Sequence, residues 1–496
     1  MGLGSLQIAG ARYGRLARQR EQLYDALIGP ASATGLGRQL EGLIREMSVA
    51  THPPGSLLIN VGDRPAQLYV VGSEAVVKTV IVRRDDMKRF PEGQPKQLVA
   101  QLSARRRPFV LQSLMGSTSG TPFACVTHVE SVVGTVALET LRSVVNALSA
   151  EHRLLVLAEV NGAGLADIYD ACALLAYETA GPKLRVAARK IECSGAIHAA
   201  WSQTDLAEMA GLTRCTVCKT LRHTRIHSFP KDDCTPKIPE PAKGYRVDGA
   251  LGLKLDHWLN QLVRAIGARP PAVEVLRRSA ALWEYDEDDV VWVAGSTRVA
   301  LVLKGHLRVD VTLVDPRAHT DTVGAWVCGP GTILGPAAVA GARRPAVPIN
   351  ARAMTDTTVA WLEAPVLSAF LGGLSGDEYL ALIRAHARHL MSRLRERIDL
   401  VPMSRADRIL HVVRLLNAKL LRTDEHSEEP LIRRNDLEAL VATSRTGLAH
   451  ELSSLTSTGR IRMSNRNEIE VLDDAGRRCG VLPLRLTTRG SREVRD

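Results

Sequence analysis

The sequence predicts an α+β fold built as two tandem units, each with a strand-rich region, a long helix and a pair of short helices. Three observations support this fold. The stretch that begins at Asp205 returns at Asp436, 231 residues later (436 − 205), without a gap. Short apolar runs separated by turn residues precede each long helix. Apolar residues in both long helices recur at alternating steps of three and four. A repeat this long indicates a duplicated set of domains rather than a solenoid.

The first half is predicted to begin with helices and to continue with strands. Leu36, Leu40, Leu43 and Ile44 form one apolar stripe at helical spacing. From Pro53 the chain reads as short strands to about residue 136, and a long helix follows to about residue 177. The expected packing seam of this helix is Leu157, Asn161, Gly164, Ile168, Ala171 and Leu175. The matching seam in the long helix of the second half is Leu380, Ile383, Ala387, Leu390, Leu394 and Arg397.

The second half repeats this order after a proline-rich segment that is read as a tether or an extended wing. The arginine-rich end of the chain is predicted to be a loose tail. The expected divisions are 1–50 (helical), 51–137 (first strand region), 138–180 (first long helix), 181–227 (first helix pair), 228–250 (tether), 251–374 (second strand region), 375–401 (second long helix), 402–475 (second helix pair with a wing) and 476–496 (tail).

Composition narrows the class of protein. The 496 residues carry a formal net charge of +11, and the isoelectric point is about 9.4, which favours a polyanionic partner such as nucleic acid. Eight irregularly spaced cysteines do not suggest a disulfide framework. The sequence shows no long apolar run or secretory signal, so a cytoplasmic protein is expected.

The repeated stretch carries the strongest functional signal. In each copy an apolar-spaced helix ends at a small residue, Gly211 or Ala442, and Thr213 or Ser444 is expected to cap the next helix. Arg214 and Arg445 then fall in the first turn. This arrangement is typical of a helix-turn-helix, in which the start of the second helix meets base edges in the major groove.

Base contacts are expected from the outward face of each second helix, where arginine can bond guanine in a bidentate manner. Ile461 and Ile469 open two predicted strands of a basic β-hairpin wing. The expected base-reading residues are Arg214, Cys215, Lys219, Arg445, Thr446 and His450. The expected DNA-backbone contacts are Thr213, Arg222, Arg225, Arg433, Arg434, Ser444, Arg462, Asn465 and Arg466.

Together these features resemble the cyclic-AMP receptor (catabolite activator) family, and they do so twice, over about residues 50–475. The resemblance implies, for each unit, a cyclic-nucleotide-type β-roll, a long dimerisation helix and a C-terminal winged helix. It places the family's recognition arginine on Arg214 and Arg445. At the family's next base-contacting position, where the family has an acid, this chain has Cys215 and Thr446. At the family's second basic base-contacting position it has Lys219 and His450. The two half-sites are therefore expected to differ. RNA polymerase is a partner that the resemblance implies.

The residues that hold a cyclic nucleotide in that family are largely replaced. Its Gly-Glu pair falls on Leu111-Gln112 in the first roll and on Gly335-Pro336 in the second. Its phosphate-binding arginine falls on Pro122 in the first roll and on Arg344 in the second, so Arg344 is the one candidate ligand residue. Control by a cyclic nucleotide is not expected, although another small ligand stays open.

Other chemistry receives less support. The Cys215-x-x-Cys218 pair, with His223, His227 and Cys234, has zinc-like spacing, but Cys218 is expected to face inward on the second helix. The acidic run 286–289 is read as a solvated turn. No catalytic motif is found, so an enzyme is not expected.

The sequence thus predicts a transcription regulator that binds a two-half-site DNA operator as a single-chain, monomeric pseudo-dimer. Two alternatives remain open. The winged helices and rolls could instead form a protein-binding scaffold, or the chain could sense another small ligand.

Overall fold

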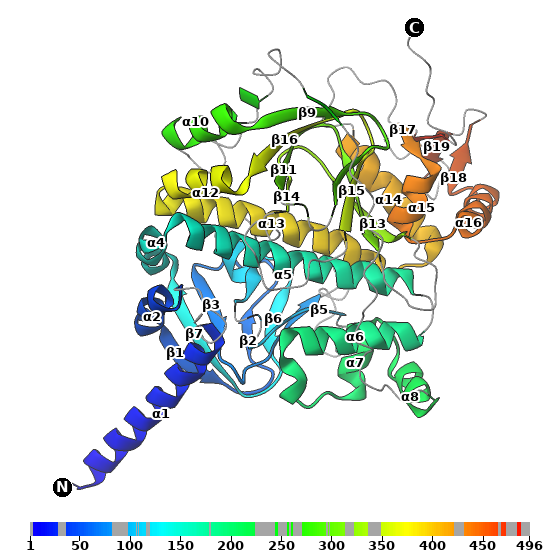
Figure 1. Cartoon of the computed structure of the whole chain (residues 1–496). Coiled ribbons are helices and arrows are strands. Elements are labelled where there is room, and N and C mark those ends of the chain that lie inside the picture. Colours follow the sequence, from blue (N-terminus) through cyan, green and yellow to red (C-terminus); the bar gives the residue numbers. More distant parts are fainter. Residues whose placement is uncertain are drawn as a thin grey trace.

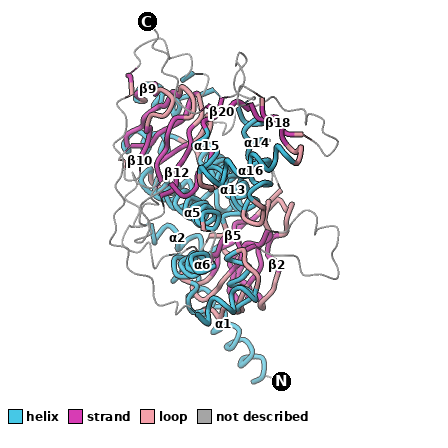
Figure 2. Tube along the Cα trace, turned by 90° about the vertical axis from the view of Figure 1, so that its right-hand side faces the viewer, coloured by secondary structure: helices cyan, strands magenta, loops and turns pink. Residues whose placement is uncertain are grey.

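The computed structural model shows a mixed helix and sheet protein in which two long helices run side by side between two groups of strands (Figure 1). The N-terminal helix α1 extends away from the body, and Figure 2 shows the same arrangement from the side. The structure describes residues 3–27, 36–81, 98–105, 107, 109–115, 120–177, 180–223, 244–246, 255–256, 259–260, 270–293, 296, 298–312, 322–335, 349–420, 431–464, 468–472 and 484–487.

The strands of the first half form two antiparallel sheets, which we call the first sheet pair. Their orders are β1-β7-β3 and β2-β6-β4-β5. Helices α1 (Leu3–Leu27) and α2 (Leu36–Glu46) precede them. The strands are β1 (Ser48–His52), β2 (Leu57–Ile59), β3 (Gln67–Val71), β4 (Val77–Ile81), β5 (Leu98–Ser103), β6 (Ala124–Thr127) and β7 (Ser131–Ala137), and the short helix η2 (Leu111–Met115) lies between β5 and β6.

The second half builds the same topology, which we call the second sheet pair. Its sheets have the orders β14-β11-β16-β9-β8 and β10-β15-β12-β13, so β9-β16-β11 and β10-β15-β12-β13 repeat the two orders of the first half. The strands are β8 (Tyr245–Arg246), β9 (Ala281–Tyr285), β10 (Val290–Val293), β11 (Arg298–Lys304), β12 (Leu307–Thr312), β13 (Thr322–Cys328), β14 (Ile333–Leu334), β15 (Ile349–Ala353) and β16 (Thr357–Glu363).

The predicted first long helix is divided near residue 148. Helix α4 (Leu138–Ala147) ends there, and Ser149 caps α5 (Ala150–Ala176) by accepting a hydrogen bond from the His152 N–H. In the second half, α10 (Pro270–Ser279) and α12 (Ala364–Gly373) precede α13 (Gly376–Leu400). Ser375 and Glu378 form a capping box at the start of α13.

Helices α5 and α13 are parallel and pack along each other. Tyr379 contacts Arg153, and His386 contacts Asn161, with sequence separations of 226 and 225 residues. Because the separation stays constant along the contact, the two helices run in the same direction and in register. The side chains of both predicted seams are buried. This pairing joins the two halves within one chain.

Two corrections concern segments that were expected to be irregular. Residues 245–246, at the end of the expected tether, form β8 and pair with β9 at the edge of the second sheet pair. Part of the expected loose tail forms β20 (Leu484–Thr487), which pairs with β17 (Leu431–Arg433) and β19 (Glu468–Val471). In both places strand pairing satisfies backbone groups of neighbouring edge strands.

Candidate nucleic-acid interface

Two short-helix pairs follow the long helices. The first helix pair is α7 (Gln203–Ala210) and α8 (Arg214–His223), packed on α6 (Ala180–Ser194). The second helix pair is α15 (Arg434–Val441) and α16 (Arg445–Ser457), packed on α14 (Arg405–Leu420). A hairpin of β18 (Ile461–Met463) and β19 follows α16.

The turn inside the first pair is determined by local chemistry. Ser202 and Asp205 form a capping box that starts α7. Gly211 ends α7 in the left-handed region, at φ 63°, where glycine has no Cβ penalty. The Thr216 N–H then donates to Thr213 Oγ1 at 3.2 Å, which confirms Thr213 as the cap of α8. Arg214 is therefore the first helical residue.

The second pair repeats this turn with different residues. Ala442 ends α15 in the left-handed region at φ 55°, without the freedom of glycine. The Gly447 N–H donates to Ser444 Oγ at 3.1 Å, which confirms Ser444 as the cap of α16. A Cβ on Gly447 would lie 2.7 Å from Thr443 Oγ1, so glycine also allows this turn to be tight. Arg445 occupies the place that Arg214 has in α8.

The faces of α8 and α16 divide cleanly by polarity. Val217 and Leu448 are fully buried and hold the helices to their domains. The six expected base-reading side chains are all exposed, as contact with base edges would require: Arg214, Cys215, Lys219, Arg445, Thr446 and His450. Figure 1 places α8 and α16 at the same end of the α5–α13 pair, at the right of that view.

The expected backbone-contact residues have more varied surroundings. Arg222 is exposed, and the Arg462 side chain is 67% exposed, 3.6 Å from Glu470. Arg434 is 27% exposed and lies 3.6 Å from Glu438. Thr213 and Ser444 are exposed caps. Arg225, Asn465, Arg466 and the candidate ligand residue Arg344 lie outside the described residues.

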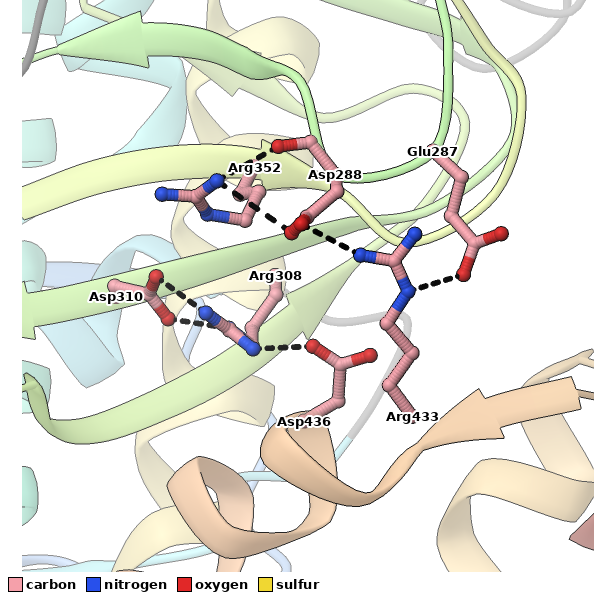
Figure 3. A network of polar contacts seen from close by, with 7 residues as sticks. All are labelled: Glu287, Asp288, Arg308, Asp310, Arg352, Arg433 and Asp436. Carbon is pink, nitrogen blue, oxygen red and sulfur yellow. Dashed lines mark hydrogen bonds and ion pairs between the residues drawn. The ribbon is translucent and has the colours of Figure 1, made fainter. Parts of the chain in front are cut away.

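Arg433 has a role different from the expected phosphate contact. Its guanidinium pairs with Glu287 and with Asp288, each at 2.7 Å, and its side chain is only 15% exposed (Figure 3). Both acids belong to the run 286–289, which forms the exposed turn that the sequence predicted. Arg433 therefore ties the start of α15 to the turn between β9 and β10. A phosphate would have to displace two carboxylates to reach it.

A second set of ion pairs lies deeper in the same contact. Arg308 on β12 contacts both carboxylate oxygens of Asp310, at 2.5 and 2.8 Å, and also pairs with Asp436 on α15 (Figure 3). Burial opposes charge on this guanidinium, but the two carboxylates raise the pKa of Arg308. Burial raises the pKa of Asp436, while Arg308 and Arg433 oppose that rise. We call this set the second latch.

The first half has a contact at the corresponding place. Lys78 Nζ on β4 lies 2.8 Å from Asp205 Oδ1 on α7, and His128 Nδ1 lies 3.8 Å from the same oxygen. Burial raises the pKa of Asp205, but bonds from Lys78 and Ser202 outweigh it, so the pKa lies below its usual value. We call the Lys78–Asp205 pair the first latch.

The latches were missed by sequence reasoning, although a signal was present. Asp205 and Asp436 are the identical residues that open the repeated stretch, and both were read only as part of a DNA-binding signature. Asp205 also completes the capping box of α7, so an acid at this position has a local role as well as a distant partner. The acid alone therefore did not reveal that a basic residue of the sheet pair would contact it.

Buried polar side chains meet at the place where the resemblance puts the family's Gly-Glu pair in the first sheet pair. Gln112 donates to Thr79 Oγ1 at 3.0 Å and to Gln101 Oε1 at 2.9 Å, and all three side chains are buried. Met391 from α13 lies against this group, with its sulfur 3.9 Å from Gln112 Nε2. Side chains of both halves therefore occupy this space.

The cysteine pair on α8 shows mixed exposure. Cys215 is exposed, and Cys218 is half-buried rather than fully inward, with its thiol 2.6 Å from Gln203 Oε1. His227 and Cys234 lie outside the described residues. Within the described part of the chain no group of three or more His, Cys, Asp or Glu side chains could hold a metal ion. Among the same residues no helix is long and apolar enough to cross a membrane.

Comparison with known proteins gives only distant likenesses. No family model and no curated protein matches the chain. The c-di-GMP-responsive global regulator CLP of Xanthomonas campestris is 14% identical, with 38% of this chain and 90% of that chain covered, at a TM-score of 0.30. FixK2 from Bradyrhizobium japonicum is 16% identical, with 36% and 83% covered, at 0.28. The regulatory domain of Toxoplasma gondii PKA is 11% identical, with 75% and 97% covered, at 0.23.

Proposed function

We propose that this protein is a sequence-specific DNA-binding transcription regulator in which a single chain supplies both DNA-reading helices. One observation carries the proposal most directly. Helices α8 and α16 each begin with a capped, exposed arginine, and both lie at the same end of the paired long helices. Two recognition helices that are held on a common frame can enter successive major grooves about 34 Å apart.

Joining the two helix pairs in one chain has consequences for affinity and for specificity. Once the first helix pair is bound, the second is presented to the neighbouring half-site at an effective concentration of roughly millimolar. The two second helices also differ, since Cys215 and Lys219 correspond to Thr446 and His450. An operator with two unlike half-sites is therefore the natural target. RNA polymerase and a cytoplasmic location remain predictions from the sequence.

The proposal does not include control by a cyclic nucleotide. In the first sheet pair the place of the family's Gly-Glu pair is taken by Gln112, which bonds Thr79 and Gln101 and lies beside Met391. Pro122 offers no donor to a phosphate there. Arg344, the candidate ligand residue of the second half, has no described surroundings, so a different small ligand there stays a separate proposal.

A binding experiment with a random DNA pool tests the proposed function. The purified full-length chain should enrich a motif with two unlike halves. Its affinity should fall steeply with salt, because the logarithm of the binding constant falls against the logarithm of the salt concentration with a slope of about −0.9 for each neutralised phosphate. Arg45→Ala changes an exposed side chain of α2, at the opposite end of the molecule from α8 and α16 in Figure 1, and this control should enrich the same motif. Absence of DNA binding at low salt would favour the protein-binding scaffold instead.

A further inference from the structure

The seam between α5 and α13 places unlike residues opposite each other. Gly164 on α5 faces Leu390 on α13, and both are buried. A Cβ on Gly164 would stand 2.7 Å from Leu390 Cδ1 and 3.0 Å from Leu390 Cβ. Since the Leu390 Cβ is fixed to its backbone, a rotamer change alone would not relieve the contact. Leu390 therefore fills a space that exists because residue 164 has no side chain.

One turn away, a polar pair lies inside the same seam. His386 Nε2 is 2.9 Å from Asn161 Oδ1, and the residues are only 7% and 1% exposed. Burial lowers the pKa of His386 to about 4, so the ring is neutral near pH 7. Because the amide oxygen can only accept, Nε2 carries the proton and donates it. A buried polar pair in an apolar seam favours one register and one partner.

Near the start of α5 and α13, the residues that face each other also differ between the two helices. The Tyr379 hydroxyl on α13 donates to the Arg153 carbonyl on α5 at 2.6 Å. The Arg153 guanidinium in turn donates to the Leu371 carbonyl at 2.7 Å and lies 5.4 Å from the centre of the Tyr379 ring. Each of these contacts needs one residue from α5 and its different counterpart from the second half.

These contacts would be lost if two copies of the chain paired each long helix with itself. An α5–α5 pair would place Gly164 against Gly164 and leave a void, which costs packing energy. An α13–α13 pair would bring Leu390 against Leu390 and His386 against His386, which overpacks the seam and removes the amide acceptor. We propose that α5 and α13 are matched to each other and reject the same helix of a second copy, so each molecule holds its two helix pairs in one fixed, non-equivalent order.

The test is an exchange experiment on the full-length chain. Two versions with different affinity tags are co-expressed, and capture through one tag is probed for the other, alongside light scattering and thermal melting. The wild-type chain should show only background cross-capture, which is the reference for the variants. In the His386→Asn, Leu390→Gly double variant, α13 carries the α5 residues at both positions, so cross-capture should rise about tenfold, equivalent to a loss of ~1.4 kcal/mol of discrimination.

Ser392→Gly is the matched control, because it also introduces glycine into α13 but at an exposed position. It should melt above the double variant and show only background cross-capture. The single variants His386→Asn and Leu390→Ala serve if the double variant does not fold, and each should show a smaller rise. Stoichiometric cross-capture by the wild-type chain would overturn the proposal. So would folded seam variants whose cross-capture is no higher than that of the Ser392→Gly control. DNA binding is not measured, so failure here is distinct from failure of the proposed function.

Discussion

The first helix pair is joined to its sheet pair by one close ion pair, Lys78 with Asp205, and by His128, which stacks on Trp201 and hydrogen-bonds the Ala200 carbonyl. The second is joined by two arginines and four acids. The first latch is a single pair with side chains 13% and 14% exposed. The second latch buries Arg308 between Asp310 and Asp436, and Arg433 adds an outer clamp to Glu287 and Asp288. The same repeat position, 205 or 436, thus anchors both helix pairs with very different amounts of charge.

The apolar contacts also attach the second helix pair to its surroundings more extensively than the first. Leu437, Leu440 and Leu448 of the second pair belong to one hydrophobic cluster with the long helices and the second sheet pair. Met209 and Val217 of the first pair belong to a separate, smaller cluster with β5. Arg397, buried in α13, also donates to the Leu440 carbonyl at 3.0 Å. The second helix pair is therefore part of the central body, and the first is a more independent attachment.

This difference indicates which half is expected to move. Regions with fewer buried contacts open locally at lower free energy than the central core does. We expect the first helix pair to change its position when the protein binds DNA, while the second helix pair stays fixed relative to the long helices.

The largest expected effect comes from removing the basic residue of each latch. Arg308→Met leaves two buried carboxylates without their partner and should cost ~3–5 kcal/mol. Lys78→Met should cost only about 1–2 kcal/mol, because Asp205 keeps its bonds to Ser202. Native-state hydrogen exchange of α15 and α7 measures each effect locally. Equal losses of protection in the two helices would show that the latches are equivalent.

A smaller effect is expected on DNA recognition. Arg445→Ala should weaken binding by ~1–3 kcal/mol at one base position of one half-site, and Arg214→Ala should do the same in the other half-site. Competition binding with operators altered in one half at a time measures this. A uniform loss over all sequences, in either variant, would assign that arginine to phosphate contact rather than base reading.

The smallest effect concerns the turn inside each helix pair. Ala442 adopts a left-handed conformation that costs a residue with a Cβ about 1–2 kcal/mol, whereas Gly211 adopts it freely. Ala442→Gly should therefore raise the melting temperature by a few degrees, equivalent to a net gain of about 0.5–1 kcal/mol after the greater unfolded-state freedom of glycine. Gly211→Ala should lower it. A loss of stability in Ala442→Gly would mean that the Ala442 methyl contributes packing that exceeds the strain.

Much of the local structure followed from the amino-acid sequence alone. The capping residues Thr213 and Ser444, the exposed arginines and the two seams depend on short-range spacing, because helix periodicity and capping act within a few residues. The role of Arg433, the strand at residues 484–487 and the buried contacts of Gln112 depend instead on partners far along the chain. A single sequence does not show which distant segments meet.

The sequence by itself predicted two similar units and the residue at which each second helix begins. Only the tertiary structure showed the register in which the two predicted seams pack, with Tyr379 against Arg153 and His386 against Asn161. It also showed that Asp205 and Asp436 bind unequal basic partners. The physical reason is that local hydrogen bonds and apolar spacing are encoded within one segment. The strength of an ion pair is set by burial and by neighbouring charges that folding brings together.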